Sequence, residues 1–232
     1  MKQTRFSIDG IPVILWGEAS GKAYLYVHGQ GGNKEEAAAF AQTADERGWQ
    51  VLSLDLPEHG ERREGKEPLV PWQAVPELKR VIRWLRDNGK QRVALRATSI
   101  GAWFALLGLA DEALERCLLV SPVVDMERVI QTMMGWAGVS EEQLQARQVI
   151  PTSFGQNLSW EYLAYVRQHS ITRWEAPTHI LYAGRDNLTA RPVMEDFARR
   201  FGCEMMVMEN GEHWFHTPEQ LAVLEEWTKN RC

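Results

Sequence analysis

The chain has 232 residues, which suits one α/β domain with a full hydrophobic core. Hydrophobic residues make up 44% and charged residues 25%, and the net charge of −5 gives no electrostatic reason to bind nucleic acid or anionic lipid. No apolar run approaches the length of a membrane span and the first residues lack the apolar core of a signal peptide, so we expect a cytoplasmic protein without nucleic-acid or membrane partners.

Short strand-like runs alternate with helix-like segments along the chain. An antiparallel hairpin is predicted over residues 5–8 and 13–16, because two β-type runs flank Asp9-Gly10. Further strands are predicted over 23–29, 50–57, 93–97, 117–123, 178–187 and 203–210. Helices are predicted over 34–47, 71–89, 191–201 and 218–230, and directly after the 93–97 strand. Apolar strands separated by helices predict a single α/β domain over 1–232, with a mostly parallel central sheet and helices on both faces.

The segment 126–176 interrupts this alternation. It contains no convincing strand and is rich in methionine and aromatic residues. At about fifty residues it is much longer than the dozen or more that a crossover connection needs. Its length favours a small cap of two or three helices over the carboxyl edge of the sheet. One ordinary crossover helix with a long loop is the alternative.

The most informative stretch is the strand-to-helix junction Ala97-Thr98-Ser99-Ile100-Gly101. No turn-forming spacer separates the two elements, which holds Ser99 on a strained turn with its side chain exposed. The small residues Ala97 and Gly101 let the strand and the helix pass close together, although Ala97 stands where the usual pattern has glycine. The helix N-terminus offers an N–H group and a positive dipole end where an oxyanion would form. This pattern indicates a nucleophile elbow and hence a serine hydrolase; a buried serine in an ordinary turn is the alternative.

In the order and spacing of its parts, the chain resembles the α/β-hydrolase family over nearly its whole length. Within the family it is similar to small serine esterases of the dienelactone-hydrolase-like or peptidase-like kind. The family places a nucleophile after the fifth strand, an acid after the seventh and a histidine after the eighth. Counting strands puts Ser99, Asp186 and His213 at those places. His216 is the alternative base, and Asp125, which follows an earlier strand, is the alternative acid.

Two further loops carry the resemblance. The run HGQGG at 28–32 stands where the family has its oxyanion loop, which implies that the backbone N–H groups of Gln30 and Ile100 bind the oxyanion. The run DLPEHGER at 55–62 matches a family Asp-x-Pro-x-His-Gly run that continues with Glu-Arg in esterase- and peptidase-like members. The resemblance implies a loop-fixing role for His28 and a structural role for His59.

The resemblance implies hydrolysis of a carboxylic ester of a small molecule through an acyl-enzyme, without metal or organic cofactor. Thioesters and short peptides or amides use the same machinery. The scaffold also hosts lyases, cofactor-free oxygenases and ligand-binding proteins, which remain alternatives. Methionine and aromatic side chains line pockets without demanding polar partners, so we expect a partly apolar substrate. The pocket is predicted to involve Met133, Met134, Trp136, Trp160 and Trp214.

Overall fold

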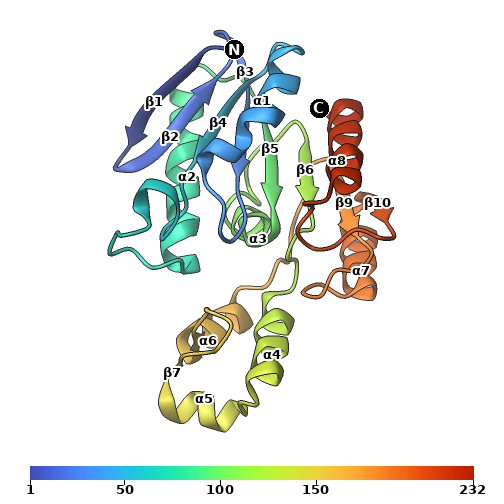
Figure 1. Cartoon of the computed structure of the whole chain (residues 1–232). Coiled ribbons are helices and arrows are strands. Elements are labelled where there is room, and N and C mark those ends of the chain that lie inside the picture. The colour runs from blue at the N-terminus through green and yellow to red at the C-terminus, as the bar shows by residue number, and fades with distance from the viewer.

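The structure, a computed structural model that describes all 232 residues, is built on one eight-stranded sheet (Figure 1). The strands lie in the order β1-β2-β4-β3-β5-β6-β9-β10. Strand β2 pairs antiparallel with β1 and β4, and the other neighbouring strands pair in parallel. The strands are β1 (Gln3–Ile8), β2 (Ile11–Trp16), β3 (Lys22–Val27), β4 (Gln50–Leu54), β5 (Arg92–Thr98), β6 (Cys117–Val120), β9 (Thr178–Ala183) and β10 (Glu204–Met208). The predicted fold class is confirmed.

Helices cover both faces of the sheet. They are α1 (Ala38–Asp45) and α8 (Pro218–Arg231) on one face, and α2 (Pro71–Asp87), α3 (Ser99–Gly108) and α7 (Arg191–Phe201) on the other. Side chains along β5 alternate between two cores, because successive residues of a strand point to opposite faces. Val93 and Leu95 join the larger core of 44 buried residues, and Ala94 joins the smaller core of 17. Buried side chains therefore pack on both faces of the sheet.

Several predicted strands end earlier in the structure than the sequence pattern indicated. The runs 50–57, 117–123 and 178–187 stop pairing at Leu54, Val120 and Ala183. The residues that follow leave the sheet and form loops at its carboxyl edge. The predicted helix 34–47 opens with a 3₁₀ turn, η1 (Lys34–Ala37), before α1, and a second 3₁₀ turn, η2 (Gly60–Arg62), follows β4.

Residues 126–168 form a separate lobe on the side where β5 and β6 end (Figure 1). It contains three helices and a two-stranded antiparallel ladder. These elements are α4 (Met126–Ala137), α5 (Glu141–Arg147), β7 (Val149–Ile150), β8 (Leu158–Ser159) and α6 (Trp160–Gln168). The β7–β8 ladder was not expected, because two-residue strands leave no alternating pattern in a sequence. That the lobe acts as a substrate cap stays a prediction.

Aromatic side chains of α6 join the lobe to the helices under the sheet. Tyr162 stacks on Trp103 of α3 with ring centroids 6.0 Å apart, and Tyr165 lies 5.5 Å from the ring of Trp72 at the start of α2. Aromatic pairs at such distances add to the stabilisation that burial alone provides. The lobe therefore packs on α2 and α3.

None of the helices combines the length and apolarity that crossing a bilayer requires.

Candidate active site

Three side chains from different strand ends meet in one hydrogen-bonded chain. Ser99 is the first residue of α3, His213 follows β10 and Asp186 follows β9. Ser99 Oγ lies 2.8 Å from His213 Nε2, and His213 Nδ1 lies 2.7 Å from Asp186 Oδ2. A carboxylate only accepts hydrogen bonds, so the imidazole donates from Nδ1 and keeps Nε2 as an acceptor for the serine hydroxyl. This arrangement can remove the proton of Ser99 when the hydroxyl attacks a carbonyl.

The backbone at Ser99 is in the left-handed region, with φ of +51°. This conformation is costly for a residue other than glycine and is concentrated at functional sites. The surrounding chain packs tightly enough to hold it. A Cβ atom on Gly101 would lie 2.1 Å from the carbonyl oxygen of His28, and one on Gly29 would lie 3.1 Å from Cβ of Ser99. The glycines thus bring the loop after β3 into contact with the turn that carries Ser99.

Asp186 is held rigidly behind the imidazole. Its side chain is fully buried, and Oδ1 accepts hydrogen bonds from the backbone N–H groups of Leu188 at 2.8 Å and Thr189 at 2.9 Å. The loops that carry Asp186 and His213 are also tied to each other, because Arg185 N donates to the carbonyl of Gly211 at 2.9 Å. The distance between the carboxylate and the imidazole is therefore set by backbone contacts.

The two alternatives named from sequence lie elsewhere. Asp125 caps α4, where Oδ1 accepts from Arg128 N at 3.1 Å and Oδ2 pairs with Arg128 Nε at 3.0 Å. His216 donates from Nδ1 to the carbonyl of Trp214 at 2.7 Å. Neither side chain contacts His213 or Ser99 through a hydrogen bond.

The two amides expected to bind an oxyanion are unoccupied by other partners. Neither Gln30 N–H nor Ile100 N–H donates a hydrogen bond within the chain. Ile100 is the second residue of α3, where the first N–H groups of a helix lack intrahelical acceptors. Gln30 adjoins Gly29, which touches Ser99. Both N–H groups are therefore available near the serine, and their role as oxyanion donors stays a prediction.

The five residues expected to line the pocket are dispersed. Met134 is buried in the larger core, and Met133 and Trp160 pack against that core. Trp136 is 52% exposed, and Trp214, which follows His213, is 75% exposed and stacks on His216. None of the five lines the cavity beside α7, so their contact with substrate stays a prediction.

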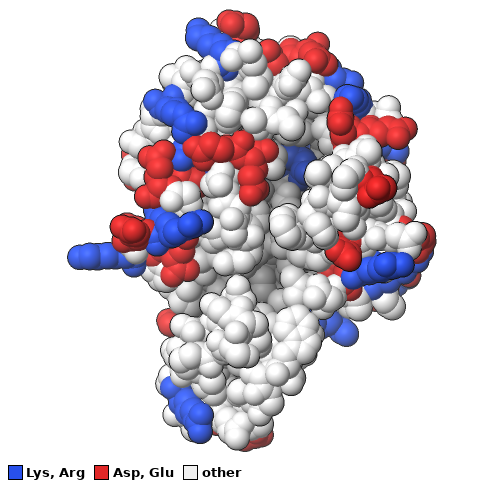
Figure 2. All heavy atoms as spheres, in the orientation of Figure 1, with Lys and Arg blue, Asp and Glu red and all other residues white.

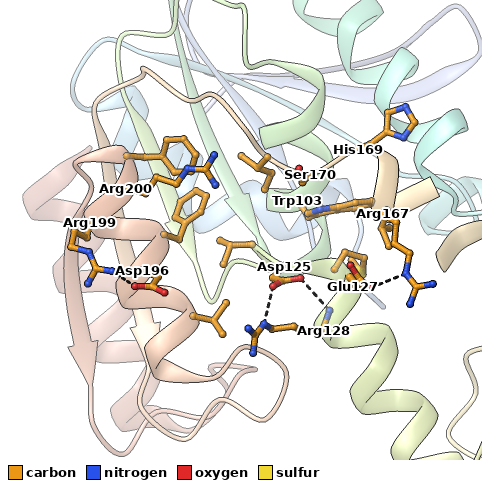
Figure 3. A pocket seen from close by; sticks show the side chains of 17 residues that line it. Trp103, Asp125, Glu127, Arg128, Arg167, His169, Ser170, Asp196, Arg199 and Arg200 are labelled. Carbon is orange, nitrogen blue, oxygen red and sulfur yellow. Dashed lines mark hydrogen bonds and ion pairs between the residues drawn. The ribbon is translucent and has the colours of Figure 1, made fainter. Parts of the chain in front are cut away.

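A cavity with a volume of about 540 Å³ lies between the start of α4, residues 169–171 and α7 (Figure 3). Its apolar wall includes Trp103, Ile171 and Phe197, and its rim carries the ion pairs Arg128–Asp125 and Arg199–Asp196. Neither the nucleophile nor its two partners line this cavity. The sequence did not predict this cavity, because the cavity forms where segments distant in the chain meet. The one local signal is Trp103, one helical turn after Ser99.

No group of three or more His, Cys, Asp or Glu side chains is arranged to hold a metal ion.

Comparison with known proteins agrees with this architecture. A family model described as "Alpha/beta hydrolase family" matches residues 24–226. Est1E from Butyrivibrio proteoclasticus with ferulic acid bound is similar in structure, with a TM-score of 0.77, 16% identity, and coverage of 98% of this chain and 96% of that one. Alpha/beta hydrolase domain-containing protein 10 from mouse is similar with a TM-score of 0.77, 12% identity, and coverage of 99% and 98%.

A thioesterase domain from the curacin biosynthetic pathway is also similar, with a TM-score of 0.61, 18% identity, and coverage of 98% of both chains. No curated protein sequence matches the chain. Identities this low show a shared fold, whereas the family match spans most of the chain. The chain therefore belongs to the alpha/beta hydrolase family.

Proposed function

We propose that the protein is a serine esterase in which Ser99 is the nucleophile, His213 the general base and acid, and Asp186 the group that orients the imidazole. The observation that carries the proposal is the unbroken hydrogen-bonded chain from Ser99 Oγ through His213 to Asp186, with distances of 2.8 and 2.7 Å. The strained backbone of Ser99 and the unoccupied amides of Gln30 and Ile100 support it.

The mechanism follows from these groups. Ser99 Oγ attacks the ester carbonyl while His213 Nε2 takes the hydroxyl proton, and the buried Asp186 carboxylate stabilises the resulting imidazolium. The N–H groups of Gln30 and Ile100 hold the tetrahedral oxyanion, and each such donor contributes about 3–4 kcal/mol. His213 returns the proton to the leaving alcohol. Water then attacks the acyl-enzyme through the same groups, which releases the acid and restores Ser99.

The substrate is proposed to be small and partly apolar. In Figure 2, mostly uncharged residues surround the hollow between the lobe and the sheet, which favours an apolar acyl or alcohol group. The similar fold of Est1E, solved with ferulic acid, supports including an aryl ester among the substrates tested. The similar fold of the curacin thioesterase domain supports including a thioester.

The test is a series of p-nitrophenyl esters from acetate to dodecanoate, with methyl ferulate and an acyl thioester, on the wild type and Ser99→Ala. We expect activity that peaks at one chain length and is abolished in Ser99→Ala, whose thermal unfolding is unchanged. Asp186→Asn is expected to lower kcat by about 10⁴-fold, because the imidazole then takes the wrong tautomer. Asp125→Asn is the matched control, since Asp125 pairs with Arg128 and not with His213.

Each other outcome has a definite meaning. Ester turnover that persists in a clean Ser99→Ala preparation excludes Ser99 as nucleophile. No ester or thioester turnover, with Ser99 still labelled by a fluorophosphonate, means an active nucleophile with another reaction class such as amide hydrolysis or a lyase reaction. No turnover and no labelling favours a ligand-binding protein on this scaffold.

A further inference from the structure

The oxyanion loop, residues 28–34 after β3, is bound by the loop after β4, residues 55–61. Lys34 N donates to Asp55 Oδ1 at 2.9 Å, and Lys34 Nζ pairs with Asp55 Oδ2 at 2.6 Å. Both side chains are buried, with 2% and 0% exposed. Asp55 Oδ2 also accepts from Glu61 N at 3.0 Å. The buried ion pair fixes the two loops at their bases, so any group on one of them has a defined position relative to the other.

Two histidines extend this connection into the oxyanion loop itself. His28 Nδ1 lies 2.7 Å from the carbonyl oxygen of Gly29, and His28 Nε2 lies 3.0 Å from Leu56 N. His59 Nδ1 lies 2.7 Å from the carbonyl oxygen of Pro57, and His59 Nε2 lies 2.9 Å from Gly31 N. Carbonyl oxygens only accept and backbone N–H groups only donate. Both imidazoles are therefore neutral, with the proton on Nδ1 and an acceptor at Nε2.

These contacts fall on the two peptide groups that flank Gln30. The carbonyl of Gly29 and the N–H of Gln30 belong to one planar trans peptide, so the His28 bond to that carbonyl orients the N–H of Gln30 in the opposite direction. The N–H of Gly31 belongs to the next peptide, and His59 holds it. With both planes held, Gln30 N–H is left without an acceptor in the chain.

On this basis we propose that His59 is a positioning residue for ester hydrolysis. Its neutral Nε2 accepts a hydrogen bond from Gly31 N and so holds the peptide after Gln30, which leaves the Gln30 N–H facing the oxyanion. The inference rests on the proposed function and adds to it a residue from the loop after β4. His59 is 4% exposed and its ring lies 5.1 Å from that of His28, so the two imidazoles that bind the loop are neighbours.

The kinetic test uses His59→Ala, which removes the acceptor, and His59→Gln, whose side-chain carbonyl can accept from Gly31 N. A lost oxyanion donor costs about 10²–10³-fold in kcat, and a misaligned one costs less. We expect His59→Ala to lower kcat about 10- to 100-fold with KM within about twofold, and His59→Gln to recover most of the loss. His179→Ala is the matched control, because His179 pairs with Glu204 at the other end of β9.

A second readout does not depend on catalysis. In the Ser99→Ala protein we expect the Gly31 amide to be protected from hydrogen exchange, to exchange at least about tenfold faster when His59→Ala is added, and to regain protection with His59→Gln. The ¹⁵N spectrum of His59 should show a proton on Nδ1 and none on Nε2. If wild type hydrolyses no ester while Gly31 behaves in this way, the proposed function fails and the positioning contact stands.

Three results would overturn the inference. Gly31 exchange that is unaffected by His59→Ala means that His59 does not hold the loop. A kcat in His59→Ala within twofold of an active wild type means that the contact has no catalytic consequence. Equal impairment of His59→Gln and His59→Ala, at equal thermal stability, means that the imidazole acts through packing and not as an acceptor.

Discussion

At the scale of single residues, the site is defined by which atom of each imidazole carries the proton. His213 donates from Nδ1 to a carboxylate and accepts at Nε2 from a hydroxyl. His28 and His59 have the same proton arrangement, but their partners are backbone groups. Under the proposed function, the same residue type serves proton transfer in one place and loop geometry in two others, and the difference lies in the hydrogen-bond partners.

His28 makes folding stability depend on pH. Burial lowers the pKa of His28 from 6.5 to about 4. Between these values the unfolded chain binds more protons than the folded one, so stability falls as pH drops from 6.5 towards 4, by about 3 kcal/mol in total. Urea unfolding at pH 7, 5.5 and 4.5 should show this loss in wild type and a weaker one in His28→Asn. Equal slopes in the wild type and His28→Asn would contradict the assignment to His28.

At the scale of elements, the crossing of α3 with the oxyanion loop is the tightest point near the site. A Cβ atom at Gly101 would lie 2.1 Å from a backbone carbonyl, so one of the two segments must shift. We expect Gly101→Ala to lower the free energy of unfolding by about 1–3 kcal/mol and to reduce kcat, because the loop that moves carries Gln30. Gly135→Ala in α4 is the matched control.

Gly135 has open space around a new Cβ atom and lies inside a helix. Alanine there should raise the free energy of unfolding by about 0.5–1 kcal/mol, since glycine loses more conformational freedom in a helix. Thermal and urea unfolding of the pair measures both effects. If Gly101→Ala and Gly135→Ala changed the free energy of unfolding by the same amount in the same direction, the close packing at Gly101 would not determine its effect.

The elements that sequence reasoning identified are those with a local signal. The junction at Ser99 could be predicted because a strand and a helix adjoin there without a spacer. The apolar patterns with strand and helix periods predicted the sheet and its helices. The β7–β8 ladder and the cavity beside α7 could not be predicted from the sequence. Two-residue strands have no period, and a cavity depends on how distant segments meet. The tie between the loops after β3 and β4 was missed for the same reason.

At the scale of the whole molecule, aromatic side chains join the lobe to the helices packed on the sheet. Trp72 of α2 is one of them, against Tyr162 at 6.1 Å and Tyr165 at 5.5 Å. We expect Trp72→Ala to speed proteolytic cleavage in residues 121–125 and 169–177 several-fold, because the lobe then moves more freely on these segments. Fluorophosphonate labelling of Ser99 should persist, since the strand ends that carry the site are untouched.

Trp136→Ala is the control, because Trp136 is exposed and lies against Phe154 of the lobe itself. Its cleavage rate in the same segments should match that of the wild type. Cleavage that is unchanged by Trp72→Ala would mean that the aromatic contacts do not hold the lobe.

The placement of the lobe has a consequence for how such proteins diversify. Its chain leaves after β6 and returns to β9, and these two strands are neighbours in the sheet. Residues 126–168 can thus be exchanged for a segment of different length without altering the register of the eight-stranded sheet. Ser99, Asp186 and His213 lie outside that segment, so such an exchange leaves their hydrogen-bonded chain in place. Under the proposed function, the substrate range would then change by segment replacement while the reaction stays the same.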